Sequence, residues 1–104
     1  MGYHRLMDRE TAIAILRKHE GELRRRGVRH AALFGSTARG EASMSSDVDV
    51  MVALDRETVR DLYDYVGVVH FISDLFPIAV DVANRDVLKA SIRDKVEQDA
   101  IHAF

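Results

Sequence analysis

Three aspartates and a small-residue turn carry the clearest chemical signal in this chain. The turn Gly35-Ser36 is followed by ten residues and then by the acidic pair Asp47-x-Asp49. A third acid, Asp81, lies inside a later apolar run. Carboxylate oxygens are the ligands that Mg²⁺ prefers, and proteins usually share Mg²⁺ between carboxylates and substrate phosphates. The pattern therefore predicts an enzyme site for a divalent metal and a nucleoside triphosphate.

Each of these residue types suits one part of such a site. Side chains two residues apart on a strand share a face, so Asp47 and Asp49 are expected side by side, with Asp81 on an adjacent strand. Two Mg²⁺ ions held by these carboxylates can bind a triphosphate and activate an attacking hydroxyl for in-line displacement. Gly35 lets the backbone approach phosphate closely, and Ser36 can donate from its hydroxyl and its N–H. A short helix starting at Ser36 would direct further N–H groups at the phosphates.

Simpler explanations exist for each motif taken alone. An isolated Asp-x-Asp is common at solvated strand edges, and Gly-Ser is ordinary turn chemistry. The combination is less ordinary, because Asp49 and Asp81 both interrupt apolar strands, where an unpaired charge is costly. Arg39 has two interpretations of equal weight. It either contacts the nucleotide phosphates or pins the turn to a nearby carboxylate.

The composition of the whole chain limits the function classes. With 104 residues, 47% of them hydrophobic, the chain is expected to form a single domain over residues 1–104. It has no cysteine, so thiolate chemistry is excluded. The net charge of −2 gives no broad attraction to nucleic acid, and direct nucleic-acid binding is not expected. No apolar stretch predicts a signal peptide or a membrane span, so a cytoplasmic protein is expected.

Hydrophobic periodicity predicts alternating helices and strands. The expected helices cover about residues 8–26, 55–75 and a stretch after Asn84, which would cap the last one. The expected strands cover residues 28–34, 48–54 and 78–82, with a short edge strand at 101–104. The order predicts a small α/β (α+β) fold, in which a short mixed β-sheet is flanked by helices.

The same periodicity predicts which helix faces are buried. In the helix at 55–75, capped by Asp55, the expected buried stripe is Val59, Leu62, Tyr63, Val66 and Val69. One of Tyr63 and Tyr65 is expected to face the core. In the last helix, the expected apolar positions are Leu88, Ile92 and Val96.

The motif resembles the signature of the polymerase-β-like nucleotidyltransferase superfamily, which is Gly-Ser, about ten residues, and then Asp-x-Asp. The fuller string from Gly35 to Gly40, with Ser46-Asp47-Val48-Asp49-Val50, is similar to the minimal nucleotidyltransferase branch. The resemblance covers about residues 28–104. Members of that branch are often single small domains, and many are antitoxins paired with a toxin that has a HEPN domain.

The resemblance implies a role for each matching residue. Asp47, Asp49 and Asp81 would bind two Mg²⁺ ions, and Asp81 would also be the general base. Gly35 and Ser36 would hold the β- and γ-phosphates of ATP, the nucleotide substrate. In the antitoxin members, AMP passes from ATP to a tyrosine of the HEPN toxin. The same function is expected here, in a hetero-oligomer with such a partner.

Two other functions remain open from the sequence. The chain could be a non-catalytic binding module that neutralises its partner by masking it. It could also be a catalytic subunit that modifies a small molecule or RNA. No acceptor-binding domain is expected from the sequence, so a tRNA, primer or antibiotic substrate would need another subunit to bring it to the site.

Overall fold

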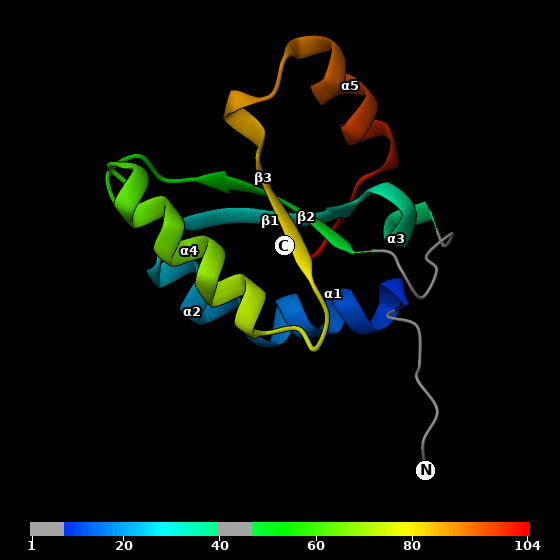
Figure 1. Cartoon of the computed structure of the whole chain (residues 1–104), viewed down its shortest axis with the longest axis horizontal. Coiled ribbons are helices and arrows are strands. Elements are labelled where there is room, and N and C mark those ends of the chain that lie inside the picture. The colour runs from blue at the N-terminus through cyan, green and yellow to red at the C-terminus, as the bar shows by residue number, and fades with distance from the viewer. Residues whose placement is uncertain (1–7, 40–46) are drawn as a thin grey trace.

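A mixed four-stranded β-sheet forms the centre of the molecule in the computed structural model, which describes residues 8–39 and 47–104 (Figure 1). The strands are β1 (Val28–Phe34), β2 (Val48–Leu54), β3 (Val80–Asn84) and β4 (Ile101–His102). Their order in the sheet is β3-β2-β1-β4. Strand β1 runs antiparallel to β2 and β4, whereas β2 and β3 are parallel. The predicted mixed sheet is confirmed, and β4 is the predicted edge strand.

Helices cover the two faces of the sheet unequally. They are α1 (Arg9–Lys18), α2 (Glu20–Arg25), α3 (Gly35–Arg39), α4 (Leu62–Asp74) and α5 (Ala90–Asp99), with a 3₁₀ turn, η1 (Arg85–Val87), after β3. Helices α1, α2 and α4 lie on one face, and α5 lies on the other (Figure 1). The result is the small α+β fold that the sequence predicted. Within the described residues, no helix combines the length and the apolar character that crossing a bilayer requires.

Strand β2 separates the two faces residue by residue. Val48, Val50 and Val52 are completely buried and belong to the core beneath α1, α2 and α4. Asp49 and Ala53, which alternate with them, are half-buried on the opposite face. This is the period-two pattern that the sequence shows. One strand therefore supplies both the core and the acidic site.

The first helical segment is two helices, so the prediction of one helix over 8–26 was wrong. Helix α1 ends at Lys18, and α2 begins at Glu20. His19 breaks the path between them, and its Nδ1 lies 2.9 Å from the carbonyl oxygen of Ile15. Gly27 follows α2 with φ +103°, where a Cβ atom would lie 2.7 Å from Val59 Cγ2. This glycine ends the segment directly after residue 26, where the predicted helix also ended.

The long helix begins later than predicted. Asp55 does not cap it but closes a separate turn, in which its Oδ1 accepts a hydrogen bond from the N–H of Glu57 at 2.9 Å. The cap of α4 is Asp61, whose Oδ1 accepts from the N–H of Asp64 at 2.9 Å. Both aspartates can cap a helix, and local propensity did not distinguish them.

The predicted buried stripe of this helix was largely wrong. Leu62, Tyr63 and Val66 are 75%, 88% and 43% exposed. The buried residues are Val68 and Ile72, supported by partly buried Tyr65, Phe71 and Leu75. Apolar residues occur on more than one side of α4, so periodicity alone did not determine its phase. One tyrosine does face inward, because the hydroxyl of Tyr65 donates to the carbonyl oxygen of Val82 at 3.4 Å, and burial raises its pKa.

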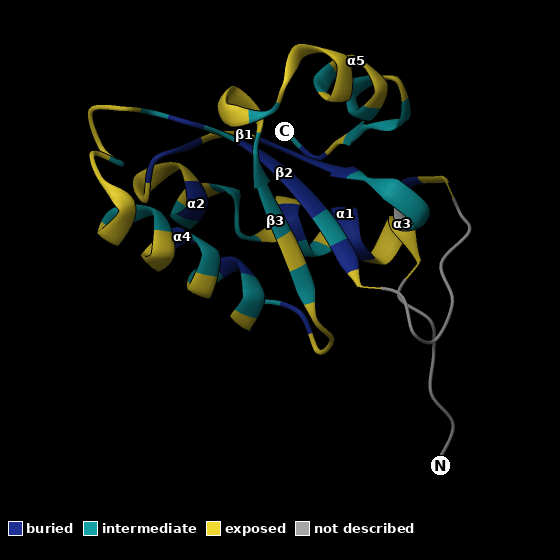
Figure 2. Cartoon of the chain, turned by 45° about the horizontal axis from the view of Figure 1, so that its top comes forward, coloured by how far each residue is buried: buried dark blue, intermediate teal, exposed yellow. Residues whose placement is uncertain are grey.

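The third strand and the last helix are both displaced along the chain. Strand β3 covers Val80–Asn84, two residues beyond the prediction. Asn84 caps the 3₁₀ turn instead of the last helix, accepting from the N–H of Asp86 at 3.0 Å. Helix α5 has no buried residue, and Ile92 is 49% exposed (Figure 2). Helix α5 therefore packs loosely over its face of the sheet.

Candidate active site

Two strands bring two of the predicted carboxylates to the same level of the sheet. Asp49 on β2 is the direct partner of Asp81 on β3 in the parallel ladder. On its other side, Asp49 pairs with Phe34, the last residue of β1. Neighbouring positions in a sheet carry their side chains on the same face. Asp49 and Asp81 therefore face the same side, with the end of β1 beside them.

The Gly35 turn lies directly against Asp49. Gly35 has φ +70°, a backbone conformation that residues other than glycine rarely adopt. A Cβ atom at this position would overlap Asp49 Oδ2. The glycine is therefore required twice, by its backbone angle and by its closeness to the carboxylate. Ser36 follows it in the first turn of α3 and is half-buried.

Asp49 sits in an environment that disfavours its charged form. Burial raises the pKa of this carboxyl, and the negative charges of Asp81 and Asp47 raise it further. The positive charge of Arg39 acts in the opposite direction. All three predicted carboxylates are thus electrostatically coupled, although Asp47 lies one residue before β2 and is exposed. Concentrated negative charge of this kind favours binding of a cation.

Helix α3, which carries the Gly-Ser turn, is held from two sides. Arg9 of α1 donates from Nη1 to the carbonyl oxygen of Ala38 at 3.2 Å. Arg39 Nη1 pairs with Asp99 Oδ2 of α5 at 3.3 Å. Arg39 thus pins the turn to a carboxylate, but this carboxylate belongs to α5 and not to the acidic site. Its predicted contact with phosphate remains a prediction.

The acidic residues fit Mg²⁺ in the manner of a substrate-shared site. Among the described side chains, no three acidic or histidine groups converge closely enough to enclose an ion by themselves. A Mg²⁺ ion in a nucleotide site usually takes one or two carboxylates and completes its shell with phosphate oxygens and water. The adjacent pair Asp49 and Asp81, with Asp47 nearby, matches that donor set.

Two residues of the predicted motif fall outside the described residues, and the ion-pair partner of Arg39 was not predicted. Gly40 and Ser46 fall outside the described residues. Asp99 was not predicted, because it is separated from Arg39 by 60 positions and its contact depends on how α5 crosses the sheet. Alternation along β2, in contrast, already indicated the face on which Asp49 lies.

Known nucleotidyltransferases are similar to this chain over most of its length. The chain matches the model of the nucleotidyltransferase domain over residues 16–102. It is 35% identical over 94 residues to the protein adenylyltransferase MntA of Thermococcus cleftensis, and the match covers 89% of this chain and 93% of the relative.

Two solved structures share the fold. One, assigned to the minimal nucleotidyltransferases, superposes with a TM-score of 0.77 at 32% identity, covering 96% of this chain and 98% of the other. A chain from a toxin–antitoxin complex with AMP-PNP matches with a TM-score of 0.66 at 16% identity, covering 85% of this chain and 72% of that chain. At that identity the second match concerns the fold alone.

Proposed function

Because the chain belongs to the nucleotidyltransferase domain family, we propose that it transfers AMP from ATP to a hydroxyl group of a partner toxin and thereby acts as an antitoxin. The acceptor is a tyrosine, and the partner is a protein with a HEPN domain. The observation that carries the proposal is the placement of Asp49 between Asp81 and the Gly35 turn. The relative named a protein adenylyltransferase supports the chemistry. The fold match to a chain of a toxin–antitoxin complex is consistent with the partner class.

The proposed reaction is an in-line displacement at the α-phosphorus. The acceptor oxygen forms a bond to this phosphorus, and the bond between the phosphorus and the oxygen bridging to the β-phosphate breaks. Pyrophosphate leaves, and Asp81 accepts the proton of the acceptor hydroxyl. Bound Mg²⁺ supplies neutralisation of the phosphate charge and lowers the pKa of the attacking hydroxyl. Most of the acceleration then comes from positioning and electrostatic stabilisation.

The protein side chains divide the remaining tasks. The Gly35-Ser36 backbone and the Ser36 hydroxyl hold the β- and γ-phosphates. Asp47, Asp49 and Asp81 would hold two Mg²⁺ ions. Strand β3 is an edge strand and Asp81 is exposed, so an acceptor carried by another protein can reach this side of the site.

The decisive experiment uses ATP labelled at the α-phosphate. The protein, Mg²⁺ and the protein encoded beside it are incubated together, and label on the partner is measured. We expect labelling that Asp47→Asn and Asp49→Asn abolish. Asp74→Asn, an exposed position at the end of α4, is the matched control and should label normally. Label transfer that survives loss of both Asp47 and Asp49 would overturn the mechanism.

Neutralisation by masking is the second candidate function. The observation that favours it is the exposed apolar surface formed by Leu62, Tyr63 and Val66 on α4, because exposed apolar patches often mark contact surfaces. Masking and catalysis make opposite predictions for Asp49→Asn. Under catalysis this variant binds the partner but fails to neutralise it. Under masking it neutralises the partner at wild-type strength.

A further inference from the structure

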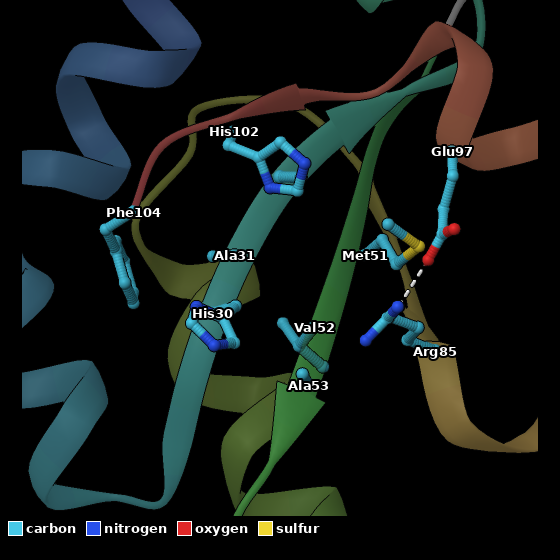
Figure 3. Close-up of a pocket in the computed structure, with 10 residues that line it drawn as sticks. His30, Ala31, Met51, Val52, Ala53, Arg85, Glu97, His102 and Phe104 are labelled. Atoms are coloured by element: carbon cyan, nitrogen blue, oxygen red, sulfur yellow. Dashed lines mark hydrogen bonds and ion pairs between the residues drawn. The ribbon is translucent and has the colours of Figure 1, made fainter.

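A second feature of the acidic face is a cavity of about 550 Å³ between the sheet and α5. Its size is within the range of small-molecule sites. Figure 3 shows His30, His102 and Phe104 on one side of it and the ion pair of Arg85 with Glu97 on the other. Met51, Val52 and Ala53 of β2 lie between these two sides. None of the roles assigned above uses this cavity.

The cavity is connected to the carboxylates by strand β2. Asp49, Met51 and Ala53 alternate with the core residues and so share one face of the sheet. Met51 and Ala53 both line the cavity. With a rise of ~3.3 Å per residue, Met51 lies ~7 Å and Ala53 ~13 Å along the strand from Asp49. A ligand that reacts at Asp49 and extends along β2 therefore reaches the cavity.

The lining of the cavity suits a flat heteroaromatic ring. Ala53 leaves room above the sheet, and the Met51 thioether is a soft, polarisable contact for a ring. At one side, Arg85 Nε lies 2.5 Å from Glu97 Oε1. Their mutual bond uses one N–H and one oxygen, whereas arginine has five N–H donors and a carboxylate has about four acceptor positions. A donor and an acceptor therefore stand next to each other at the side of the cavity.

We propose that this cavity binds the base of the nucleotide substrate, and that Arg85 and Glu97 select adenine over guanine. The inference rests on the proposed function, which places the α-phosphate beside Asp49 and the β- and γ-phosphates beside Gly35. The ribose then lies along β2, and the base lies over Met51 and Ala53. Adenine presents a ring nitrogen acceptor next to an amino donor, which complements an arginine beside a carboxylate. Guanine presents an oxygen acceptor in place of that amino group and would face Glu97 unfavourably.

Distance favours the base over the acceptor ring as the occupant. In a tyrosine the reactive hydroxyl is bonded directly to its ring. With that hydroxyl at Asp49, the ring would lie near Met51 and would not extend to Ala53, which is ~13 Å from Asp49 along the strand. A nucleotide has a ribose between its reacting phosphate and its base, and it therefore reaches farther.

Filling the cavity tests the proposal. Ala53→Leu places a larger side chain in the cavity from a half-buried position. Binding of ATP and of inorganic tripolyphosphate is measured by calorimetry with Mg²⁺ and without acceptor protein. We expect ATP affinity to fall about tenfold, the equivalent of ~1.4 kcal/mol, and tripolyphosphate affinity to stay unchanged. Ala14→Leu, which adds the same volume at an exposed position of α1, is the matched control and should alter neither.

The outcomes separate this inference from the proposed function. Unchanged ATP affinity in Ala53→Leu overturns the base site, as does an effect confined to the KM for the acceptor protein. Normal base binding without transfer to any acceptor overturns the proposed function and leaves the base site standing. A wild-type protein that fails to bind ATP overturns both.

The choice of adenine has its own test. We expect the wild-type protein to bind ATP about tenfold more tightly than GTP, and Glu97→Gln to remove most of this preference, because an amide can donate to the guanine oxygen. Glu20→Gln, which alters another glutamate paired with an arginine, should leave the preference intact. Equal wild-type affinity for ATP and GTP would overturn the selection by Arg85 and Glu97.

Discussion

The two faces of the sheet differ in what their side chains do. The face beneath α1, α2 and α4 is closed by completely buried residues, among them Leu16, Leu33 and Ile72. The opposite face carries Asp49 and Asp81, and the helix above it, α5, has no buried residue (Figure 2). A tightly packed face supplies stability, which allows the other face to hold mutually repelling carboxylates and an open cavity. The difference indicates that stability and chemistry are separated in this fold because successive side chains of one strand point to opposite faces.

The largest expected effect falls on the acidic face. Asp81→Asn should lower the rate of nucleotidyl transfer by ~100-fold or more, because it removes a preorganised charge at the reacting centre. Its free energy of unfolding should not fall, since Asp81 is exposed and its charge disfavours the ionised form of Asp49. Transfer assays and urea titration measure the two quantities, with Asp74→Asn as the control. Undiminished transfer by Asp81→Asn would remove this residue from the site.

How much of the structure could be predicted from the sequence depends on how far apart along the chain the interacting residues lie. The alternation of valines with Asp49 is local, and it predicted strand β2 correctly. The exposed face of α4 was mispredicted because Leu62, Tyr63 and Val66 follow the same helical period as a buried stripe would. The pairing of Arg39 with Asp99 has no local signal at all. Contacts that depend on how α5 crosses the sheet could therefore not be predicted from the sequence pattern.

A substitution on the packed face should have the opposite effect from Asp81→Asn: it should lower stability and leave transfer unchanged. Leu33→Ala removes a completely buried side chain of β1 and should lower the free energy of unfolding by about 2–5 kcal/mol. Transfer per folded molecule should stay near the wild-type rate at a temperature at which the variant is folded. Urea denaturation and active-site titration provide these values. A loss of transfer in the folded variant would show that the two faces are coupled.

Gly35 is the point at which the two faces are expected to respond together. Gly35→Ala forces a Cβ atom onto Asp49 Oδ2 and strains the backbone at φ +70°, at a cost of about 1–3 kcal/mol. Transfer should also fall, because the displaced turn no longer holds the phosphates. Gly21→Ala, at an exposed position of α2 with room for a Cβ atom, serves as the control. Normal activity and stability in Gly35→Ala would contradict the geometry of the turn.

The smallest effect is expected on the outer side of α4. Leu62→Ser alters a side chain that is 75% exposed, so the free energy of unfolding should change by no more than ~0.5 kcal/mol. A loss of several kcal/mol in the free energy of unfolding would show that Leu62 is buried, as the sequence pattern predicted. The measurement is a urea titration beside Ile72→Ala, at a completely buried position of the same helix.

Adjacent residues of β2 provide the most direct test that one strand divides stability from chemistry. Val50 is completely buried, whereas Asp49 is on the other face with a raised pKa. Because burial and neighbouring charges oppose the ionised carboxylate, Asp49→Asn should raise the stability of the metal-free protein near neutral pH. That advantage should shrink as the pH falls through the raised pKa toward the ordinary value of 3.8, where wild-type Asp49 becomes neutral as well.

Two quantities are measured for both Asp49→Asn and Val50→Ala. The free energy of unfolding is measured without metal, and the transfer rate is measured with Mg²⁺. We expect a reciprocal result. Asp49→Asn loses transfer and gains stability, and Val50→Ala loses stability while its folded fraction transfers AMP normally. A large loss of stability in Asp49→Asn, or retained transfer by that variant, would contradict the division of stability and chemistry between the two faces of β2.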